Sequence, residues 1–265
     1  MEVERLHILL TNDDGIYAPG LYALYNALKD KHRIEIVAPD VEVSAVGHGI
    51  TLSSPLRVHE ARRNGDFYGY AVNGTPADCV KIAVQELLDT RPDMVISGIN
   101  AGANVGVNVL YSGTVSAATE GAFLGLRAAA VSLDERVEPD FSAAASLMPG
   151  IVAFMESIGD WPGGVALNIN IPALPASALA GIVAVRQATL RFKDRYEKRK
   201  DPRGRDYYWL AGEEAFCGEG AEDTDVYALK RGMVTLTPIH YDLTCNRSLG
   251  EFGRRPMPAV NKLAG

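Results

Sequence analysis

Residues 7–15 read HILLTNDDG, and this stretch decides the fold class because an apolar run passes at once into polar turn residues. The run HILL predicts a short buried strand. Beyond the turn, Leu21, Leu24 and Leu28 recur with the spacing of an amphipathic helix. A buried strand that leads through a polar turn into a helix is typical of the first half of a parallel βαβ unit.

The same alternation continues along most of the chain. Thr75 and Pro76 suit the N-cap and the first turn of a further helix. The pattern also predicts strands over residues 34–37, 92–97, 128–133 and 165–171, and helices over residues 112–126 and 141–158. Strands that alternate with helices predict an α/β fold, with a doubly wound, mostly parallel sheet in a Rossmann-like arrangement of three layers. Ligands of such sheets bind beyond the carboxyl ends of the strands.

Two regions depart from the alternation. Residues 51–70 indicate a β-hairpin with Asn64-Gly65 as its turn. From Gly181 onward the pattern predicts a solvated arm or hairpin over residues 191–205, an acidic loop over residues 213–225 and a strand over residues 234–239. Because no linker divides the chain, we expect a single domain over residues 1–265, with a core over about 1–180 and a strand-rich C-terminal arm over about 181–265.

The composition argues against several classes of protein. With 26 Lys and Arg against 33 Asp and Glu the net charge is −7, which argues against a general nucleic-acid binder and against binding to anionic membranes, but allows one local phosphate pocket. No membrane span and no signal peptide are expected. Cys79, Cys217 and Cys245 are too far apart to indicate a disulfide framework or a thiolate zinc site. We therefore expect a cytoplasmic protein.

Asp13 and Asp14 follow the first predicted strand directly. Two adjacent carboxylates at such a place are costly unless something compensates their charge. In the turn that Gly15 permits, both side chains can converge on one point, where a divalent cation would neutralise them. The alternative is that one of them caps the helix that starts near Pro19 while the other is solvated.

Three later segments end at the same edge of the predicted sheet. Ser44 offers a hydroxyl oxygen and His48 a proton donor or phosphate ligand, although each of them, taken alone, is more typical of an ordinary surface loop. Asn100 offers an amide oxygen, or alternatively braces its own glycine-rich loop, which matches neither a dinucleotide fingerprint nor a P-loop. Ser112 and Thr114 open a helix, where they suit an anion site, simple N-capping, or both.

Together these segments supply carboxylate, hydroxyl and amide oxygens. Such a ligand set suits a hard cation such as Mg²⁺, Mn²⁺ or Ca²⁺ better than Zn²⁺. The neighbouring anion site makes phosphate the expected substrate group, and a metal there can polarise a phosphoryl oxygen and lower the pKa of a bound water.

Five motifs in this order resemble the SurE (survival protein E) family of acid-loop metallophosphatases: LLTNDDGIYAPG, VAPDVEVSAVGHGITL, VNGTPADCVKIA, PDMVISGINAGANVG and YSGTVSAATEGA. The resemblance is dense over about residues 5–175. It implies one divalent metal ion per subunit. By motif position it implies Asp13, Asp14, Ser44 and Asn100 as metal ligands, Asp13 and Asp14 as the catalytic pair, and Asn12, Ser112, Gly113 and Thr114 as the phosphate pocket.

The resemblance also implies an activity and an assembly. We expect a metal-dependent nucleotidase that hydrolyses nucleoside 5′- and 3′-monophosphates and some short polyphosphate. We also expect a homodimer or homotetramer that exchanges C-terminal segments, for which the predicted arm is suited. Val43 and Ala45 stand where many relatives carry basic residues beside the serine, so the substrate range is less defined than the metal site.

Several alternatives stay open at this point. Asp13 either attacks the phosphorus or only serves the metal, although TNDDG lacks the Asp-x-Asp spacing of haloacid-dehalogenase phosphatases. His48 is a candidate general acid for the leaving nucleoside. Two further hypotheses are a nucleotide-binding regulatory module without turnover and a metal-dependent glycosyltransferase, which would consume a nucleotide-sugar.

Overall fold

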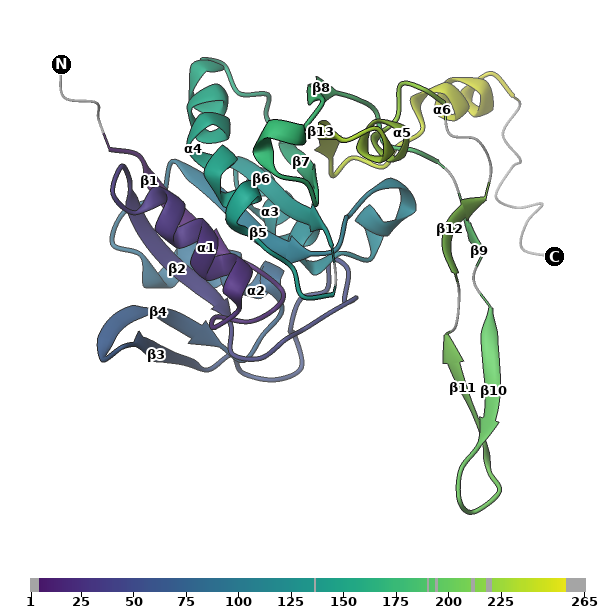
Figure 1. The fold of residues 1–265 in the computed structure, drawn as a ribbon, viewed down its shortest axis with the longest axis horizontal. Helices are drawn as coiled ribbons and strands as arrows, with labels where there is room; N and C mark the ends of the chain where they lie inside the picture. The colour runs from purple at the N-terminus through teal and green to yellow at the C-terminus, as the bar shows by residue number, and fades with distance from the viewer. Residues whose placement is uncertain are drawn as a thin grey trace.

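The computed structural model describes residues 5–135, 137–189, 191–193, 195–210, 213–217 and 221–255. Its centre is a nine-stranded sheet with the strand order β3-β4-β2-β1-β5-β6-β7-β13-β8, and helices lie on both faces (Figure 1). The strands β4, β2, β1, β5, β6 and β7 are mutually parallel. This confirms the predicted α/β class with a doubly wound, mostly parallel sheet.

The strands of this sheet are β1 (His7–Thr11), β2 (Arg33–Pro39), β3 (Val58–Arg63), β4 (Asp66–Val72), β5 (Met94–Ala101), β6 (Arg127–Asp134), β7 (Val165–Pro172), β8 (Gly181–Ala184) and β13 (Met233–His240). All five residues of β1 are buried, as are six of the eight in β6 and seven of the eight in β7. Parallel strands are covered by helices on both faces, so their sequences are continuous apolar runs instead of alternating patterns.

Helices divide between the two faces of the sheet. α1 (Pro19–Leu28) and α4 (Ser142–Ser157) pack together over one face, where Leu24 and Met148 join the same buried cluster. α2 (Pro76–Ile82), which continues as the π-helix η1 (Ala83–Leu87), and α3 (Gly113–Phe123) cover the other face. The sequence analysis predicted each of these helices, and the capping box that Thr75 forms with Asp78 confirms the predicted start of α2.

The crossovers at the centre of the sheet do not share one hand. β1–α1–β2 and β5–α3–β6 run in opposite directions across the sheet with their helices on opposite faces, so they have the same hand. β6–α4–β7 continues in the direction of β5–α3–β6 but carries α4 on the α1 face, so its hand is opposite. Because parallel crossovers are right-handed in nearly all sheets, β6–α4–β7 is the exceptional one.

The strand order reverses between the neighbouring strands β1 and β5, and this is where a ligand site is expected. The chain passes from β1 outward to β2, β3 and β4 and then returns through α2 to β5 on the other side of β1. In open α/β sheets, ligands bind at such a reversal of strand order, beyond the carboxyl ends of the two strands. The acid pair follows β1, and Asn100 lies at the end of β5.

The predicted hairpin is confirmed as β3 and β4. Asn64 and Gly65 join the two strands with φ angles of 54° and 92°. Two successive positive φ angles are what the type I′ turn of a tight hairpin requires.

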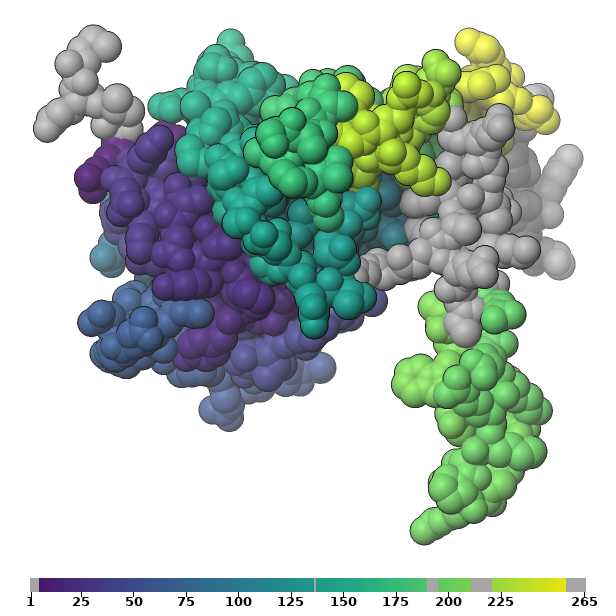
Figure 2. Space-filling model, in the orientation of Figure 1, coloured from purple at the N-terminus to yellow at the C-terminus, as the bar shows by residue number. Residues whose placement is uncertain are grey.

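The C-terminal strands divide between the sheet and a separate arm. β9 (Arg191–Lys193), β10 (Tyr196–Lys200), β11 (Asp206–Leu210) and β12 (Glu213–Cys217) form the arm, and the β10–β11 hairpin stands clear of the body (Figure 2). All residues of β10 and β11 are exposed. The chain then returns through α5 (Asp225–Lys230) to β13, which lies between β7 and β8, and α6 (Asn246–Gly253) follows.

The predicted acidic loop over residues 213–225 is wrong in part. Glu213–Cys217 is the strand β12, which pairs with β9, and α5 begins at Asp225. The sequence EEAFC begins with two charged residues and has no apolar alternation, so periodicity does not predict a strand there. Within the part of the chain that the structure describes, no helix has both the length and the apolarity needed to cross a bilayer.

Candidate active site

The turn after β1, residues 12–15, holds the acid pair and is fixed by backbone contacts. Gly15 has a φ of 97°, which only glycine adopts without strain. The Asn12 side chain donates from Nδ2 to the Gly15 carbonyl at 2.9 Å. On the far side of the turn, the Val43 amide donates to the Asp13 carbonyl at 2.8 Å. We call residues 12–15 the acid turn; its position is set mainly by the backbone of its neighbours.

Asp13 lies against the first turn of α3. Its side chain accepts a hydrogen bond from the Thr114 hydroxyl, and the residue is only 6% exposed. A Cβ atom on Gly113 would lie 2.7 Å from the Asp13 Cβ and 2.9 Å from Oδ2, so no larger residue fits at that position. Burial raises the pKa of Asp13, while hydrogen bonds from Thr114 oppose the rise. The Asp13 carboxyl is therefore fixed in position although burial makes its ionised form unfavourable.

Asp14 adds a second carboxyl beside the first. Burial raises its pKa to about 7, and the charges of Asp13 and Glu42 add to this rise. The predicted alternative, in which one acid caps the first helix, is wrong: the N-cap of α1 is Ala18, without a side-chain hydrogen bond. Burial and the neighbouring negative charges all make the ionised form of Asp14 unfavourable. A cation bound between Asp13 and Asp14 would compensate both carboxylates, and both would attract it.

A β-bulge brings Asn100 to the same edge of the sheet. Between Ser97 and Asn100, β5 has one residue more than the paired segment of β6. Gly98 lies in the bulge at a φ of 136°, where a Cβ atom would approach the Val131 carbonyl oxygen to 2.3 Å. Bulges of this kind redirect a side chain beside an active site. The Asn100 Nδ2 donates to the Gly102 carbonyl at 2.8 Å, which braces the loop. This hydrogen bond uses the nitrogen of the side-chain amide and does not use its oxygen, Oδ1.

The N-terminus of α3 combines capping with an arrangement suited to an anion. Ser112 is the N-cap, and its hydroxyl accepts from the Val115 amide at 3.1 Å. Gly113 and Thr114 form the first turn, whose amides have no acceptor within the helix. Capping is therefore observed, while phosphate binding by these residues, and by the fully buried Asn12, stays a prediction.

Residues 40–51, which we call the serine loop, connect β2 with the region before β3. Ser44 is exposed and its hydroxyl donates to Glu42 Oε1 at 2.6 Å. His48 is not an isolated surface histidine, because its Nε2 lies 2.9 Å from Glu120 Oε2 on α3. The structure thus brings Ser44 to the neighbourhood of the acid turn through Glu42, whose charge acts on Asp13 and Asp14.

A buried polar network that the sequence analysis missed holds the glycine-rich loop after β5. The Asn104 carbonyl accepts from Asn168 Nδ2 at 2.7 Å and from Asn170 Nδ2 at 3.2 Å. The Gly106 amide donates to Asp225 Oδ2 at 2.9 Å, across 119 residues of chain. Asn168 and Asn170 stand on a central strand, where polar residues are unusual, and this was the signal available in the sequence.

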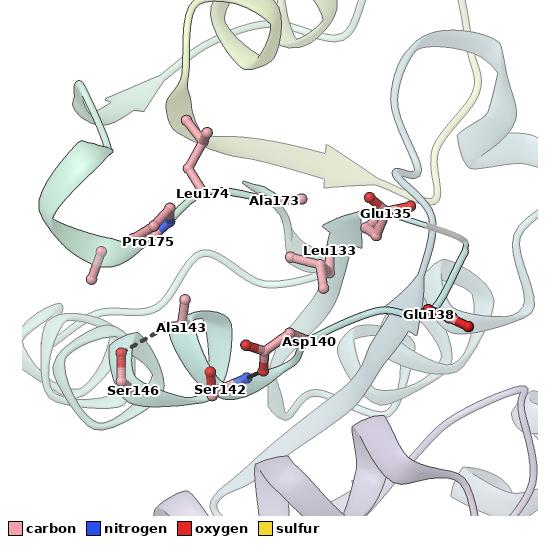
Figure 3. Close-up of a pocket in the computed structure, with 11 residues that line it drawn as sticks. Leu133, Glu135, Glu138, Asp140, Ser142, Ala143, Ser146, Ala173, Leu174 and Pro175 are labelled. Carbon is pink, nitrogen blue, oxygen red and sulfur yellow. Dashed lines mark hydrogen bonds between the residues drawn. The ribbon is translucent and has the colours of Figure 1, made fainter.

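A separate hollow of about 570 Å³ opens at the ends of β6 and β7 (Figure 3). Leu133 and Leu174 line its apolar part, and the carboxylates of Glu135, Glu138 and Asp140 lie around it. These carboxylates carry the same sign of charge as a phosphate group. The hollow therefore does not suit the phosphate, in contrast to the first turn of α3.

Among the described residues, no three His, Cys, Asp or Glu side chains are grouped as they would be around a metal ion. A cation at the acid turn would therefore depend on two carboxylates, completed by hydroxyl or amide oxygens. Ser44 and Asn100 are residues of that chemistry at the same edge of the sheet. Oxygen donors with few charges suit a hard divalent cation, so the residues present fit the metal that the sequence predicts.

Comparison with known proteins agrees with the geometry. The family model described as Survival protein SurE matches residues 8–194. A 5′-nucleotidase SurE from Syntrophobacter fumaroxidans is 50% identical over 249 residues, which are 94% of this chain and 99% of the relative. One from Syntrophus aciditrophicus is 51% identical over 239 residues, 90% of each chain. The crystal structure of the SurE protein from Aquifex aeolicus matches with a TM-score of 0.81 and 38% identity, covering 98% of this chain and all of the other.

Proposed function

The chain belongs to the SurE family, and from this premise we propose that it is a divalent-metal-dependent phosphomonoesterase that hydrolyses nucleoside 5′- and 3′-monophosphates to nucleoside and phosphate. Relatives about half identical over nearly the whole chain carry the name 5′-nucleotidase SurE, which supports a nucleotidase. Activity on 3′-monophosphates and on short polyphosphate is part of the proposal and is tested separately below.

The close approach of Asp13 to the first turn of α3 carries the proposal. The buried Asp13 carboxyl would repel a phosphate group. The N-terminus of α3, which lies directly beside it, attracts anions and would bind the same phosphate. The conflict disappears when a cation lies between the carboxyl and the phosphate. Gly113 permits this spacing, since any side chain there would displace Asp13.

Asp13 and Asp14 would hold the cation, with Ser44 and Asn100 as neutral ligands. When bound, a divalent cation supplies a Lewis acid for the phosphoryl oxygen and lowers the pKa of a water molecule. The hydrogen bonds from Thr114 oppose the rise in the pKa of Asp13 that burial causes, and they fix the direction of its carboxyl. The Asn100 side-chain amide donates to the Gly102 carbonyl, which restricts its rotation and leaves Oδ1 to serve as the proposed ligand.

The substrate phosphate would lie at the first turn of α3. The amide of Gly113 and the Ser112 hydroxyl are the candidate donors, and they would stabilise negative charge that develops on the phosphoryl oxygens, while Thr114 lines the pocket with its hydroxyl proton donated to Asp13. Ser112 is fixed by its own capping hydrogen bond, and Thr114 by Asp13. A site with donors already in place loses little free energy to reorganisation during the reaction.

The proposal includes a homodimer or homotetramer built with the C-terminal arm. Tyr196, Tyr208, Trp209 and Leu210 are each at least 58% exposed on the β10–β11 hairpin. Large apolar side chains gathered on an exposed element mark an interaction surface. Light scattering coupled to size-exclusion chromatography measures the assembly; a monomer would contradict this part of the proposal.

A substrate panel tests the function. Purified protein is assayed for phosphate release from purine and pyrimidine 5′- and 3′-monophosphates and from short polyphosphate, with Mg²⁺, Mn²⁺ or Ca²⁺ and with EDTA as control. We expect release from nucleoside monophosphates that depends on the added cation. Binding of AMP without release under every cation would instead identify a nucleotide-binding module without turnover. Release that is insensitive to EDTA would contradict the metal site.

A further inference from the structure

The serine loop is attached to the protein by separate polar contacts rather than by a buried apolar face. Val41, Ser44, Val46 and His48 are all exposed. The loop is held instead by the Val43 amide on the Asp13 carbonyl, the Gly47 amide on the Tyr111 carbonyl, the Gly49 carbonyl on Thr75 Oγ1, and Thr51 on the Asp78 carboxylate. Each of these contacts therefore has a large share in fixing where the loop lies.

Glu120 is the one buried charge that faces this loop from α3, among the described residues. Its carboxylate side chain is 6% exposed. One oxygen accepts from His48 Nε2 at 2.9 Å and the other from Lys81 Nζ of α2 at 3.2 Å. A buried carboxylate is costly without partners, and the other residues of α3 are mostly small, so the two contacts of Glu120 are what make its burial tolerable. Its two contacts join the serine loop, α2 and α3 at a single group.

α3 carries the contacts of both loops on one face. Gly113 meets the acid turn, and Glu120, seven residues later, meets the serine loop. Residues seven apart lie on the same side of a helix, about 10 Å along its axis. The helix therefore acts as a rigid support between the two loops, and it sets the position of one relative to the other.

We propose that Glu120 and His48 are positioning residues that hold the serine loop, and with it the Ser44 hydroxyl, at a fixed place relative to Asp13. This inference rests on the proposed metal site, since Ser44 matters there as a ligand. Lys81 supports the contact by holding the second oxygen of Glu120. Because Nε2 of His48 is engaged by Glu120, a proton for the leaving nucleoside would have to come from Nδ1, and the test below separates that role from positioning.

The test compares His48→Ala with His48→Gln, whose amide reaches about as far as Nε2 and can still donate to Glu120. Glu35→Gln is the matched control, because it removes a carboxylate from an ion pair. Its partner Arg33 is the first residue of β2, at the end of the strands away from the acid turn. Three quantities are measured: amide hydrogen exchange of residues 41–51 in metal-free protein, the dissociation constant of Mn²⁺ by calorimetry, and the kcat for phosphate release at saturating Mn²⁺.

We expect exchange in this segment of His48→Ala to be at least about tenfold faster, as loss of a charge-assisted hydrogen bond predicts. Mn²⁺ should bind roughly tenfold more weakly, which is typical when a residue that orients a ligand is lost. Phosphate release should return to near the wild-type kcat at saturating Mn²⁺. His48→Gln should recover most of both effects, and Glu35→Gln should show neither.

Unchanged exchange and unchanged Mn²⁺ affinity in His48→Ala would overturn the inference. A fall in kcat that saturating Mn²⁺ does not restore, with Mn²⁺ affinity intact, would also overturn it and would identify His48 as a proton donor. Glu120→Gln provides a second variant, which should loosen the same segment from the helix side. Exchange and Mn²⁺ binding need no turnover, so a protein that releases no phosphate would refute the nucleotidase and still test the positioning.

Discussion

The acid turn and the serine loop, which the proposal assigns to one site, are built in different ways. The acid turn is buried at Asn12 and Asp13 and is fixed by backbone contacts and by the close approach of Gly113. The serine loop is exposed and is held by separate polar contacts of its backbone and by the contact of His48 with Glu120. The first region tolerates almost no change of shape, whereas the second can change its side chains while its attachments persist. The proposed charged ligands are in the rigid region and the proposed neutral ligand, Ser44, is in the adjustable one.

The largest expected effect comes from removing a charge of the acid turn. Asp13→Asn should lower phosphate release from AMP by more than the roughly 10–100-fold that loss of a ligand-orienting residue costs, because a charged ligand is lost outright. The amide oxygen can still accept from Thr114, so the circular dichroism spectrum should be that of the wild type. Near wild-type turnover at limiting Mn²⁺ would show that the acid turn is structural only.

The next effect tests the rigidity of the acid turn without changing its charge. Gly113→Ala should displace Asp13 and cost about 1–3 kcal/mol of stability, as overpacking does, with a loss of activity that added metal does not restore. Gly150→Ala in α4 is the matched control, because nothing lies within 4 Å of its added Cβ and alanine favours a helix. Melting temperature and kcat report the two effects. A fully active Gly113→Ala would mean that the turn adapts.

A third prediction uses the electrostatics of the acid turn in EDTA. Because the pKa of Asp14 is raised to about 7 from an ordinary value of 3.8, its carboxylate destabilises the folded protein fully above pH 7, and this cost declines as the pH falls from 7 toward 3.8. Asp14→Asn is neutral throughout. Its melting temperature should exceed that of the wild type by a few degrees at pH 8, and the difference should shrink as the pH falls toward 5. A difference independent of pH would contradict the buried charge.

The smallest effect is expected in the adjustable region. Ser44→Ala removes a neutral ligand, so phosphate release should fall by less than about tenfold at limiting Mn²⁺ and recover in excess Mn²⁺. Ser146→Ala, on the exposed side of α4, is the control for loss of a serine hydroxyl. Full activity of Ser44→Ala at limiting metal would remove Ser44 from the ligand set and leave the serine loop without a metal contact.

The sequence predicts those parts of the structure that depend on local chemistry. The strand HILL, the turn at Gly15, the hairpin at Asn64-Gly65 and the caps at Thr75 and Ser112 follow from propensity, and the structure contains each of them. The acid pair was identified because its charge is costly at the end of a buried strand. These features need no knowledge of distant contacts.

Features that depend on distant contacts could not be predicted in the same way. Glu120 sits in a helix of small residues, and its partners come from 39 and 72 residues away. The sequence predicts an acidic loop that includes Asp225, whereas this residue is fully buried and accepts a hydrogen bond from the Gly106 amide. The opposite hand of β6–α4–β7 leaves no trace in the pattern of apolar residues, because either face of the sheet would bury α4 equally well.

The position of β13 has a consequence for how the chain is synthesised. β13 pairs with β7 in antiparallel orientation, yet the whole arm is made before β13 leaves the ribosome. Until then the edge of β7 offers unpaired backbone groups to any neighbouring nascent chain. Premature termination within the arm would therefore produce a chain that aggregates rather than a smaller stable protein, and chaperone demand should peak during translation of the last quarter of the message.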